Sequence, residues 1–324
     1  MDFFALAAQN LMTPMILCFA LGLAAALARS DLTVPEAMAK AMSLYLLFAI
    51  GFKGGVSVAS HGLDASLGLS LLVGVILSFA LPVIAYALLR VMTQLSALDA
   101  AAVSAHYGSI SIVTFVTATT VLAGRGIEAE GYMVAVAAAM EAPAIVSALW
   151  LVARSGAGPR MDARLWREIL LNGSIVLLVG SFLIGAFTGE GGMTRIESFI
   201  ISPFQGVLCL FLLDMGLVAG RGMRGAKSNL GFGALAFGVL MPIIGAVFGL
   251  GGALILGLSA GGAALMMTLA ASASYIAVPA AMRVALPEAN PSVYLTLSLG
   301  VTFPFNLVIG IPTYVAIALA VIGG

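Results

Sequence analysis

Long apolar runs separated by short polar segments dominate this chain. Ten such runs, most of them near twenty residues long, lie along its 324 residues. A hydrocarbon core of about 30 Å needs roughly 20 residues of α-helix to cross it, so each run predicts a membrane-spanning helix. The predicted helices cover residues 13–28, 37–57, 65–89, 99–122, 132–152, 169–187, 198–218, 230–258, 261–286 and 292–322.

The runs are continuous rather than alternating. Residues 67–89 are apolar at successive positions, whereas a strand of a membrane barrel alternates between polar and apolar residues. The composition agrees, with 62% hydrophobic and 9% charged residues against roughly 25% charged in soluble domains. We therefore expect an all-α polytopic membrane protein.

Positive charges collect on one side of the predicted membrane. Connections after odd-numbered helices hold eleven of the 14 Lys and Arg residues, and those after even-numbered helices hold three, Lys53, Arg125 and Arg195. Cytoplasmic loops accumulate Lys and Arg, which places the odd connections inside and both termini outside the cytoplasm. The first ten residues contain Asp2 and no basic segment, so no cleavable signal peptide is expected.

A weak internal repeat divides the chain into two halves. At an offset of 165 residues, Gly51 and Gly55 fall on Gly216 and Gly220, and Ser109 falls on Ser274. Halves of five helices each enter the membrane in opposite senses, which makes them inverted repeats of the kind found in secondary transporters. The predicted organisation is a first repeat over 1–153, a short cytoplasmic linker over 154–168 and a second repeat over 169–324. Chance similarity between glycine-rich apolar segments is the alternative.

Polar and helix-breaking residues interrupt the predicted fourth and ninth helices. Residues 104–111 read SAHYGSIS and residues 271–279 read ASASYIAVP. Non-helical backbone at membrane depth is tolerated where it lines a polar cavity, and the half-helix N-termini beyond it present amides and positive partial charge to an anion. Close packing through small residues is the alternative for any single serine. The predicted anion-binding residues are Gly108, Ser109, Ile110, Ser111, Ser272, Ala273, Ser274 and Tyr275.

Four ionisable residues fall within or at the rim of predicted helices: Lys53, His106, Glu141 and Asp214. A charge at a helix centre costs about 2.5–3.5 kcal/mol on insertion scales, so such residues usually serve ion pathways. The predicted Na⁺ ligands are Thr114, Glu141, Ser272 and Asp214. The alternative for Glu141 is a protonated or hydrogen-bonded packing residue. The alternative for Asp214 is an ion pair with Lys53 or with an arginine near the end of its helix. His106 is interpreted as a hydrogen-bonded wall residue, with a proton relay as the alternative.

Several other functions lack a signature in the sequence. Cys18 and Cys209 lie inside apolar runs, so neither a disulfide framework nor a transition-metal site is expected. No motif of a serine nucleophile, a zinc protease or a phosphate loop is present, so we expect neither an enzyme nor a cofactor. The formal net charge of 0 argues against a nucleic-acid partner.

Several motifs, in order along nearly the whole chain, resemble the cyanobacterial sodium-dependent bicarbonate transporter (SbtA) family. The motifs are Val34–Ala37, Ile50–Gly55, Leu98–Ala100, Met140–Pro143, and Ala270–Ser274 followed by Pro279, Arg283 and Ala289–Ser292. The resemblance implies ten helices in two inverted repeats, an anion between the two broken helices, Na⁺ as coupling ion and a homotrimer in the lipid bilayer.

The chain departs from that family at both breaks, which marks it as a divergent member. The family's first break reads SGST where residues 111–114 read SIVT, and its second reads SDISGP where residues 274–279 read SYIAVP. Tyr275 thus stands in place of an acid. A regulator related to PII signalling proteins engages a long central loop in the family, and the short 154–168 linker predicts weak or absent regulation of this kind.

The predicted function is Na⁺-dependent uptake of bicarbonate across a bacterial inner membrane by alternating access. A symporter for another small anion, such as a short carboxylate, is the alternative within the transporter class. A passive anion channel is the alternative from a different class.

Overall fold

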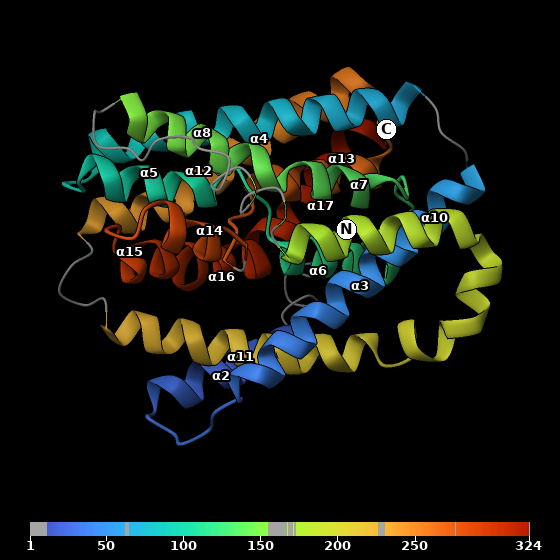
Figure 1. The fold of residues 1–324 in the computed structure, drawn as a ribbon, viewed down its shortest axis with the longest axis horizontal. Helices are drawn as coiled ribbons and strands as arrows, with labels where there is room; N and C mark the ends of the chain where they lie inside the picture. The colour runs from blue at the N-terminus through green and yellow to red at the C-terminus, as the bar shows by residue number, and fades with distance from the viewer. Residues whose placement is uncertain are drawn as a thin grey trace.

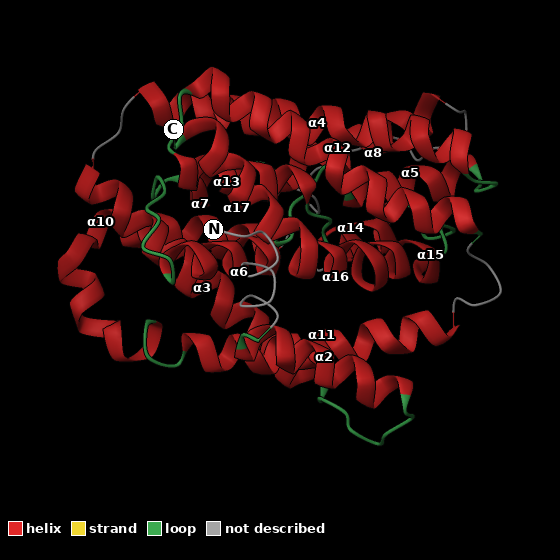
Figure 2. Cartoon of the chain, turned by 180° about the vertical axis from the view of Figure 1, so that it is seen from behind, coloured by secondary structure: helices red, strands yellow, loops and turns green. Residues whose placement is uncertain are grey.

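The computed structural model of the protein describes residues 12–61, 65–154, 167, 171, 173–225, 231–275 and 277–323. Every regular element in these ranges is a helix (Figures 1 and 2). The first half contains α2 (Pro14–Leu27), α3 (Glu36–His61), α4 (Ala65–Met92), α5 (Ala97–His106), α6 (Ile112–Ala123), α7 (Met133–Ala139) and α8 (Glu141–Arg154). The second half contains α10 (Gly173–Ile200), α11 (Phe204–Gly225), α12 (Phe232–Leu256), α13 (Ala260–Ala271), α14 (Ala277–Ala285), α15 (Pro291–Leu295), the π-helix η2 (Thr296–Thr302), α16 (Phe303–Phe305), the π-helix η3 (Asn306–Gly310) and α17 (Ile311–Ile322).

Seven helical stretches in the described ranges are long and apolar enough to cross a membrane. They are Glu36–Ser60, Ala65–Met92, Met133–Arg154, Val176–Ile200, Phe204–Gly222, Phe232–Leu256 and Pro291–Ile322. Three shorter apolar helices join them: Pro14–Leu27, Ile112–Ala123 and Ala260–Ala271. Large apolar side chains on the outer helices are exposed, including Phe187 and Ile255 at 88% and 84%. Water does not favour such a surface, whereas a lipid bilayer does.

The loop predicted between the sixth and seventh helices is largely helical in the structure. The apolar run predicts an end of the sixth helix at Phe187, and the helical backbone is interrupted two residues later, at the Gly189 kink of α10. A further helical stretch then reaches Ile200, and the next helix starts at Phe204 instead of Ser198. Gly189 has a φ of 55°, a left-handed conformation that glycine adopts without steric strain. The polar residues after Phe187 predict a loop, but most of them form this second helical stretch beyond the kink.

Two pairs of helices, one member from each half, form one side of the molecule. The most extensive helix–helix contacts join α3 to α10 and α2 to α11. Both views show α2 and α11 side by side at one edge, away from α4, α8 and α12 (Figures 1 and 2). The interrupted pairs α5/α6 and α13/α14 lie between these two regions. They are consequently enclosed, and α5 and α13 are buried along most of their length.

Candidate functional site

The first interruption separates α5 from α6 at residues 107–111. Tyr107 caps the end of α5, and Ser111 starts α6 with an extended backbone at φ −99° and ψ 107°. The Ser111 hydroxyl accepts hydrogen bonds from the Thr114 amide at 3.2 Å and from the Thr114 hydroxyl at 2.8 Å. This is the usual way in which serine satisfies the free amides of a helix N-terminus. The predicted residues Gly108, Ser109 and Ile110 are all buried in this segment.

The second interruption follows α13 and begins at Ser272. The Ser272 backbone is extended, with a φ of −80° and a ψ of 160°, and its hydroxyl donates to the Leu269 carbonyl at 2.9 Å. The Asn306 side-chain amide donates to the Ala271 carbonyl at 2.9 Å, which satisfies a carbonyl at the end of α13. Ala273, Ser274 and Tyr275 continue the segment and are buried.

Direct hydrogen bonds join the two interruptions. The Ser274 amide donates to the His106 carbonyl at 2.8 Å, and the Ser111 amide donates to the Ser272 hydroxyl at 2.9 Å. His106 also contacts the Ser274 carbonyl through Nδ1 and stacks on Tyr294 with a centroid distance of 4.8 Å. Because a carbonyl only accepts, Nδ1 donates this bond and His106 is a hydrogen-bonded wall residue here. Residues far apart in the sequence thus meet at one crossing.

A small cavity of about 10 Å³ lies at this crossing, lined by Leu47, Ile110, Ser111, Ile112, Glu141, Ser274 and Tyr275. Glu141 is only 5% exposed, and its Oε2 has no hydrogen-bond partner among the described residues. The Tyr275 hydroxyl, also buried, lies near Ser111 outside hydrogen-bonding geometry. A space of this size corresponds to roughly one water-sized sphere. In this conformation it suits a bare cation or a water, and a bound anion requires a wider space.

The remaining predicted site residues do not line the small cavity. Thr114 lies one turn into α6 and is bonded to Ser111, next to the cavity. Asp214 is buried in α11, which packs chiefly against α2, α3 and η2, and it does not line the cavity. Lys53 Nζ lies 4.5 Å from the centre of the Phe204 ring and forms no ion pair with Asp214, whereas Arg221 interacts electrostatically with the Asp214 carboxyl. The Arg283 side chain and most of the 154–168 linker lie outside the described residues.

Sequence reasoning missed the contribution of the last predicted helix. Asn306 bonds to α13 and also accepts a hydrogen bond from the Tyr314 hydroxyl at 2.8 Å. Thr302 donates to the Gly238 carbonyl at 2.6 Å and shares a hydrogen bond with the Tyr107 hydroxyl at 2.7 Å. A buried asparagine within an apolar run near Pro304 and Pro312 was the available signal, because such a polar group needs partners.

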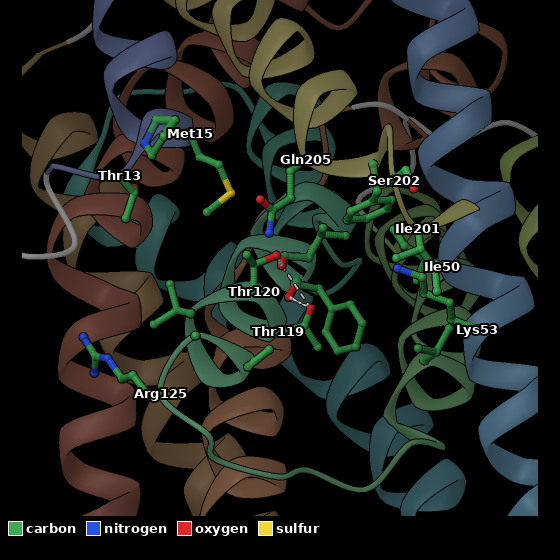
Figure 3. Close-up of a pocket in the computed structure, with 18 residues that line it drawn as sticks. Thr13, Met15, Ile50, Lys53, Thr119, Thr120, Arg125, Ile201, Ser202 and Gln205 are labelled. Carbon is green, nitrogen blue, oxygen red and sulfur yellow. Dashed lines mark hydrogen bonds between the residues drawn. The ribbon is translucent and has the colours of Figure 1, made fainter. Parts of the chain in front are cut away.

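A second cavity of about 950 Å³, called here the vestibule, is shown in Figure 3. Its lining comes from five segments: Thr13–Met15; Ile50 and Lys53 of α3; Phe115, Val116, Thr119–Val121 and Ala123–Arg125 in and after α6; Val134; and Ile201, Ser202, Phe204 and Gln205. Ile50 and Phe115 follow Leu47 and Ile112, which line the small cavity, by three residues on the same helices. Three residues are almost one helical turn, so about 5 Å separates the two levels along each helix.

Comparison with known protein families assigns the chain to one family. The family described as the Na⁺-dependent bicarbonate transporter superfamily matches residues 14–319, which include every helix named above except the end of α17. The chain belongs to this superfamily. No curated protein matches it.

Membership in the Na⁺-dependent bicarbonate transporter superfamily confirms the expected family resemblance. Together with the apolar helices, it indicates a multi-pass membrane transporter rather than an enzyme. Within the described residues, no three His, Cys, Asp or Glu side chains come together as a group that suits a transition metal. The description of the superfamily suggests Na⁺ as the coupling ion.

Proposed function

We propose that this protein is a Na⁺-dependent bicarbonate symporter of the bacterial inner membrane that works by alternating access. The observation that carries the proposal is the crossing of the two interrupted helix pairs. There Glu141 and Tyr275 line a cavity beside Ser111 and Ser274, and Glu141 Oε2 and the Tyr275 hydroxyl are buried without a hydrogen-bond partner in the part of the chain that the structure describes. Each pair, α5 with α6 and α13 with α14, is then one discontinuous membrane span. Irregular backbone at that depth is tolerated where it lines such a cavity.

The packing of α2, α3, α10 and α11 supports ten spans in two inverted repeats. Gly51 of α3 lies against α10, and Gly216, which is 165 residues later, lies against α2. Gly22 of α2 lies against α11, and Gly185 of α10 lies against α3. Each half therefore packs its first helix against the second helix of the other half. Any two-fold relation between the halves gives this reciprocity, and an odd number of five spans per half makes the relation an inverted one.

The anion site in this proposal uses the backbone of both interruptions. The Ser111 amide, at the N-terminus of α6 where the helix dipole is positive, donates its hydrogen bond to the Ser272 hydroxyl. A small anion displaces this hydroxyl and takes the amide, with Ser109 and Ser274 beside it. Ser109 Oγ is buried and has no partner among the described residues, so it is available to donate. Gly108, Ile110, Ala273 and Tyr275 form the surrounding wall.

The cation site in this proposal is the small cavity itself. Glu141 supplies a carboxylate, and the hydroxyls of Ser111 and Tyr275 lie at the same cavity. Thr114 and Ser272 adjoin it through their hydrogen bonds to Ser111. Oxygen ligands suit a hard cation such as Na⁺. Asp214 is the more distant candidate, because it lies in α11 away from this cavity.

Tyr275 favours a second candidate, symport of another small anion such as a short carboxylate. The aromatic ring takes the place of the family's acid and packs edge-on against Phe303, with ring centres 5.0 Å apart. This exchange alters both the charge and the volume next to the anion. A passive anion channel is the remaining alternative, and it differs because it does not concentrate its substrate.

The proposal includes the arrangement of the protein in the membrane. Both termini lie outside the cytoplasm, and the halves 1–153 and 169–324 are joined by the cytoplasmic linker 154–168. The resemblance extends the proposal to a homotrimer and, because the linker is short, to weak or absent regulation by a PII-like partner. No feature of the chain points to nucleic acid.

Uptake of labelled bicarbonate into proteoliposomes, with and without an inward Na⁺ gradient, tests the proposal. Accumulation above equilibrium only with the gradient is expected. Uptake without Na⁺ and without accumulation indicates a channel, and accumulation of a short carboxylate but not bicarbonate selects the second candidate. Substitution Ser274→Trp should abolish transport while the protein stays monodisperse, because the ring fills the crossing. Retained uptake in that variant overturns the site assignment.

A further inference from the structure

We propose that the vestibule is a second, Na⁺-independent anion-binding site that captures the substrate before it reaches the crossing of the interrupted helices. This inference rests on the proposed function for the identity of the anion. The observations on the vestibule do not depend on which anion is carried. They are the cavity, its two cations and the absence of a carboxylate in its described lining. The site is distinct from the crossing, because none of the residues that line the vestibule lines the small cavity.

The vestibule carries two positive charges that no carboxylate of its described lining neutralises. Lys53 and Arg125 are the charged residues in its described lining, and no carboxylate occurs in that lining. Arg125 Nη1 is buried and has no hydrogen-bond partner among the described residues. Lys53 Nζ lies over the Phe204 ring rather than against an acid. A buried guanidinium donor without a partner is costly, and an anion would satisfy it.

The position of these cations in the membrane is unusual. Of the 14 Lys and Arg residues, only Lys53, Arg125 and Arg195 are assigned to the exterior side. Two of these three line the vestibule. The lining segments Thr13–Met15, the end of α6, and Ile201–Gln205 all lie at helix ends assigned to that same side. The positive-inside rule disfavours cations there, so their collection around one cavity calls for a functional reason.

The lining offers partners for both parts of a protonated oxyanion. Figure 3 shows Thr119, Thr120 and Gln205 between Lys53 on one side and Arg125 on the other. The Thr119 and Thr120 hydroxyls donate to carbonyls of their own helix, so their lone pairs remain to accept a hydrogen bond. Bicarbonate has negative oxygens for the cations and one O–H for such an acceptor. A cleft of one charge sign also raises the local concentration of the opposite ion.

Thiol labelling measures this effect without transport. Cys18 and Cys209 are replaced by Ala, and Gln205→Cys places a reporter on an exposed lining position. The readout is the ratio of labelling rates for an anionic and a neutral thiol reagent of equal size. The ratio should fall about tenfold or more in the Lys53→Gln/Arg125→Gln double variant, because the charge that attracts the anionic reagent is removed. Thr120→Cys repeats the measurement at a second lining position.

Matched variants separate charge in the vestibule from charge elsewhere. Lys53→Arg with Arg125→Lys keeps the charges and should keep the ratio. Arg195→Gln removes the third exterior cation, which does not line the vestibule, and should leave the ratio unchanged. An unchanged ratio in the double Gln variant overturns the proposal, and so does an equal fall in Arg195→Gln.

Binding is tested by protection of the Gln205→Cys reporter with bicarbonate in the absence of Na⁺. Bicarbonate should slow labelling by the neutral reagent in phosphatidylcholine vesicles, and the double Gln variant should lose this protection. If phosphatidylglycerol in the vesicles protects and bicarbonate does not, the occupant is a lipid headgroup and the proposal fails. The double variant should also raise the KM for bicarbonate uptake without lowering kcat. If the protein carries a different anion, the labelling ratio still reports the vestibule, so the two proposals fail separately.

Discussion

At the scale of single residues, one hydroxyl connects both interruptions. Ser272 accepts from the Ser111 amide and donates to the Leu269 carbonyl, so it satisfies a donor of one helix pair and an acceptor of the other. Ser272→Ala leaves the buried Ser111 amide without a partner, which should destabilise the protein by about 1–3 kcal/mol and reduce uptake. Thermal unfolding in detergent and proteoliposome uptake measure the two effects.

Ser70 provides the control for that substitution. It is a buried serine of α4 whose hydroxyl has no hydrogen-bond partner among the described residues. Ser70→Ala removes no hydrogen bond, so its unfolding temperature and uptake should match those of the unmodified protein. Equal losses in the two variants would mean that Ser272 acts through packing alone.

Glu141 is the residue on which Na⁺ dependence should rest. Glu141→Gln keeps the shape of the side chain and removes its charge. The Na⁺ concentration for half-maximal uptake should rise about tenfold or more, because interactions with a charged group are worth about 1.5–3 kcal/mol. Glu197→Gln, on an exposed part of α10, should leave the Na⁺ dependence as it was. An unchanged Na⁺ dependence in Glu141→Gln would show that the cation does not bind at Glu141, and Asp214 would be tested next.

At the scale of elements, close backbone approach holds α10 against α3. A Cβ at Gly185 would collide with the Phe52 carbonyl oxygen, which cannot move without shifting α3. Gly185→Val should therefore destabilise the protein by about 1–3 kcal/mol through overpacking. The measurement is the temperature at which detergent-solubilised protein loses its monodisperse elution peak.

Gly180 is a control position on the same helix. A Cβ there meets no atom within 4 Å, and alanine favours helix over glycine by about 1 kcal/mol. Gly180→Ala should leave stability unchanged or raise it. Similar stability of the Gly185→Val and Gly180→Ala variants would show that the α3–α10 contact contributes little.

At the scale of the whole molecule, the vestibule and the charge distribution predict the same orientation. Ser202 lines the vestibule on the side assigned to the exterior, and Asp31 lies in the exposed connection between α2 and α3 on the opposite side. In intact cells, an impermeant maleimide should label Ser202→Cys and should label Asp31→Cys only after permeabilisation. Cys18 and Cys209 are replaced by Ala in both proteins. The reverse pattern would invert the topology and place the vestibule in the cytoplasm.

The sequence by itself determined the helical class and most helix positions, because apolar runs of membrane length have few alternatives in lipid. It also predicted irregular backbone at the Ser, Gly and Pro clusters of residues 104–111 and 271–279, and in the structure α5 ends at His106 and α13 at Ala271. That each helix pair forms one broken membrane span stays a prediction. The sequence placed the end of the sixth helix within two residues of the interruption at Gly189. It did not predict the helical stretch from there to Ile200, because most of that stretch is polar or glycine.

Only the tertiary structure decided which groups meet. Three examples depend on how distant helices pack. Ser111 bonds to Ser272, Asn306 bonds to Ala271, and Asp214 lies on a different helix from the Glu141 cavity. The vestibule is a further case, because the sequence identifies Lys53 and Arg125 only as exterior cations, and the structure shows that both line one cavity. Sequence patterns report the local cost of burying each residue, whereas a site depends on distances between residues far apart in the chain.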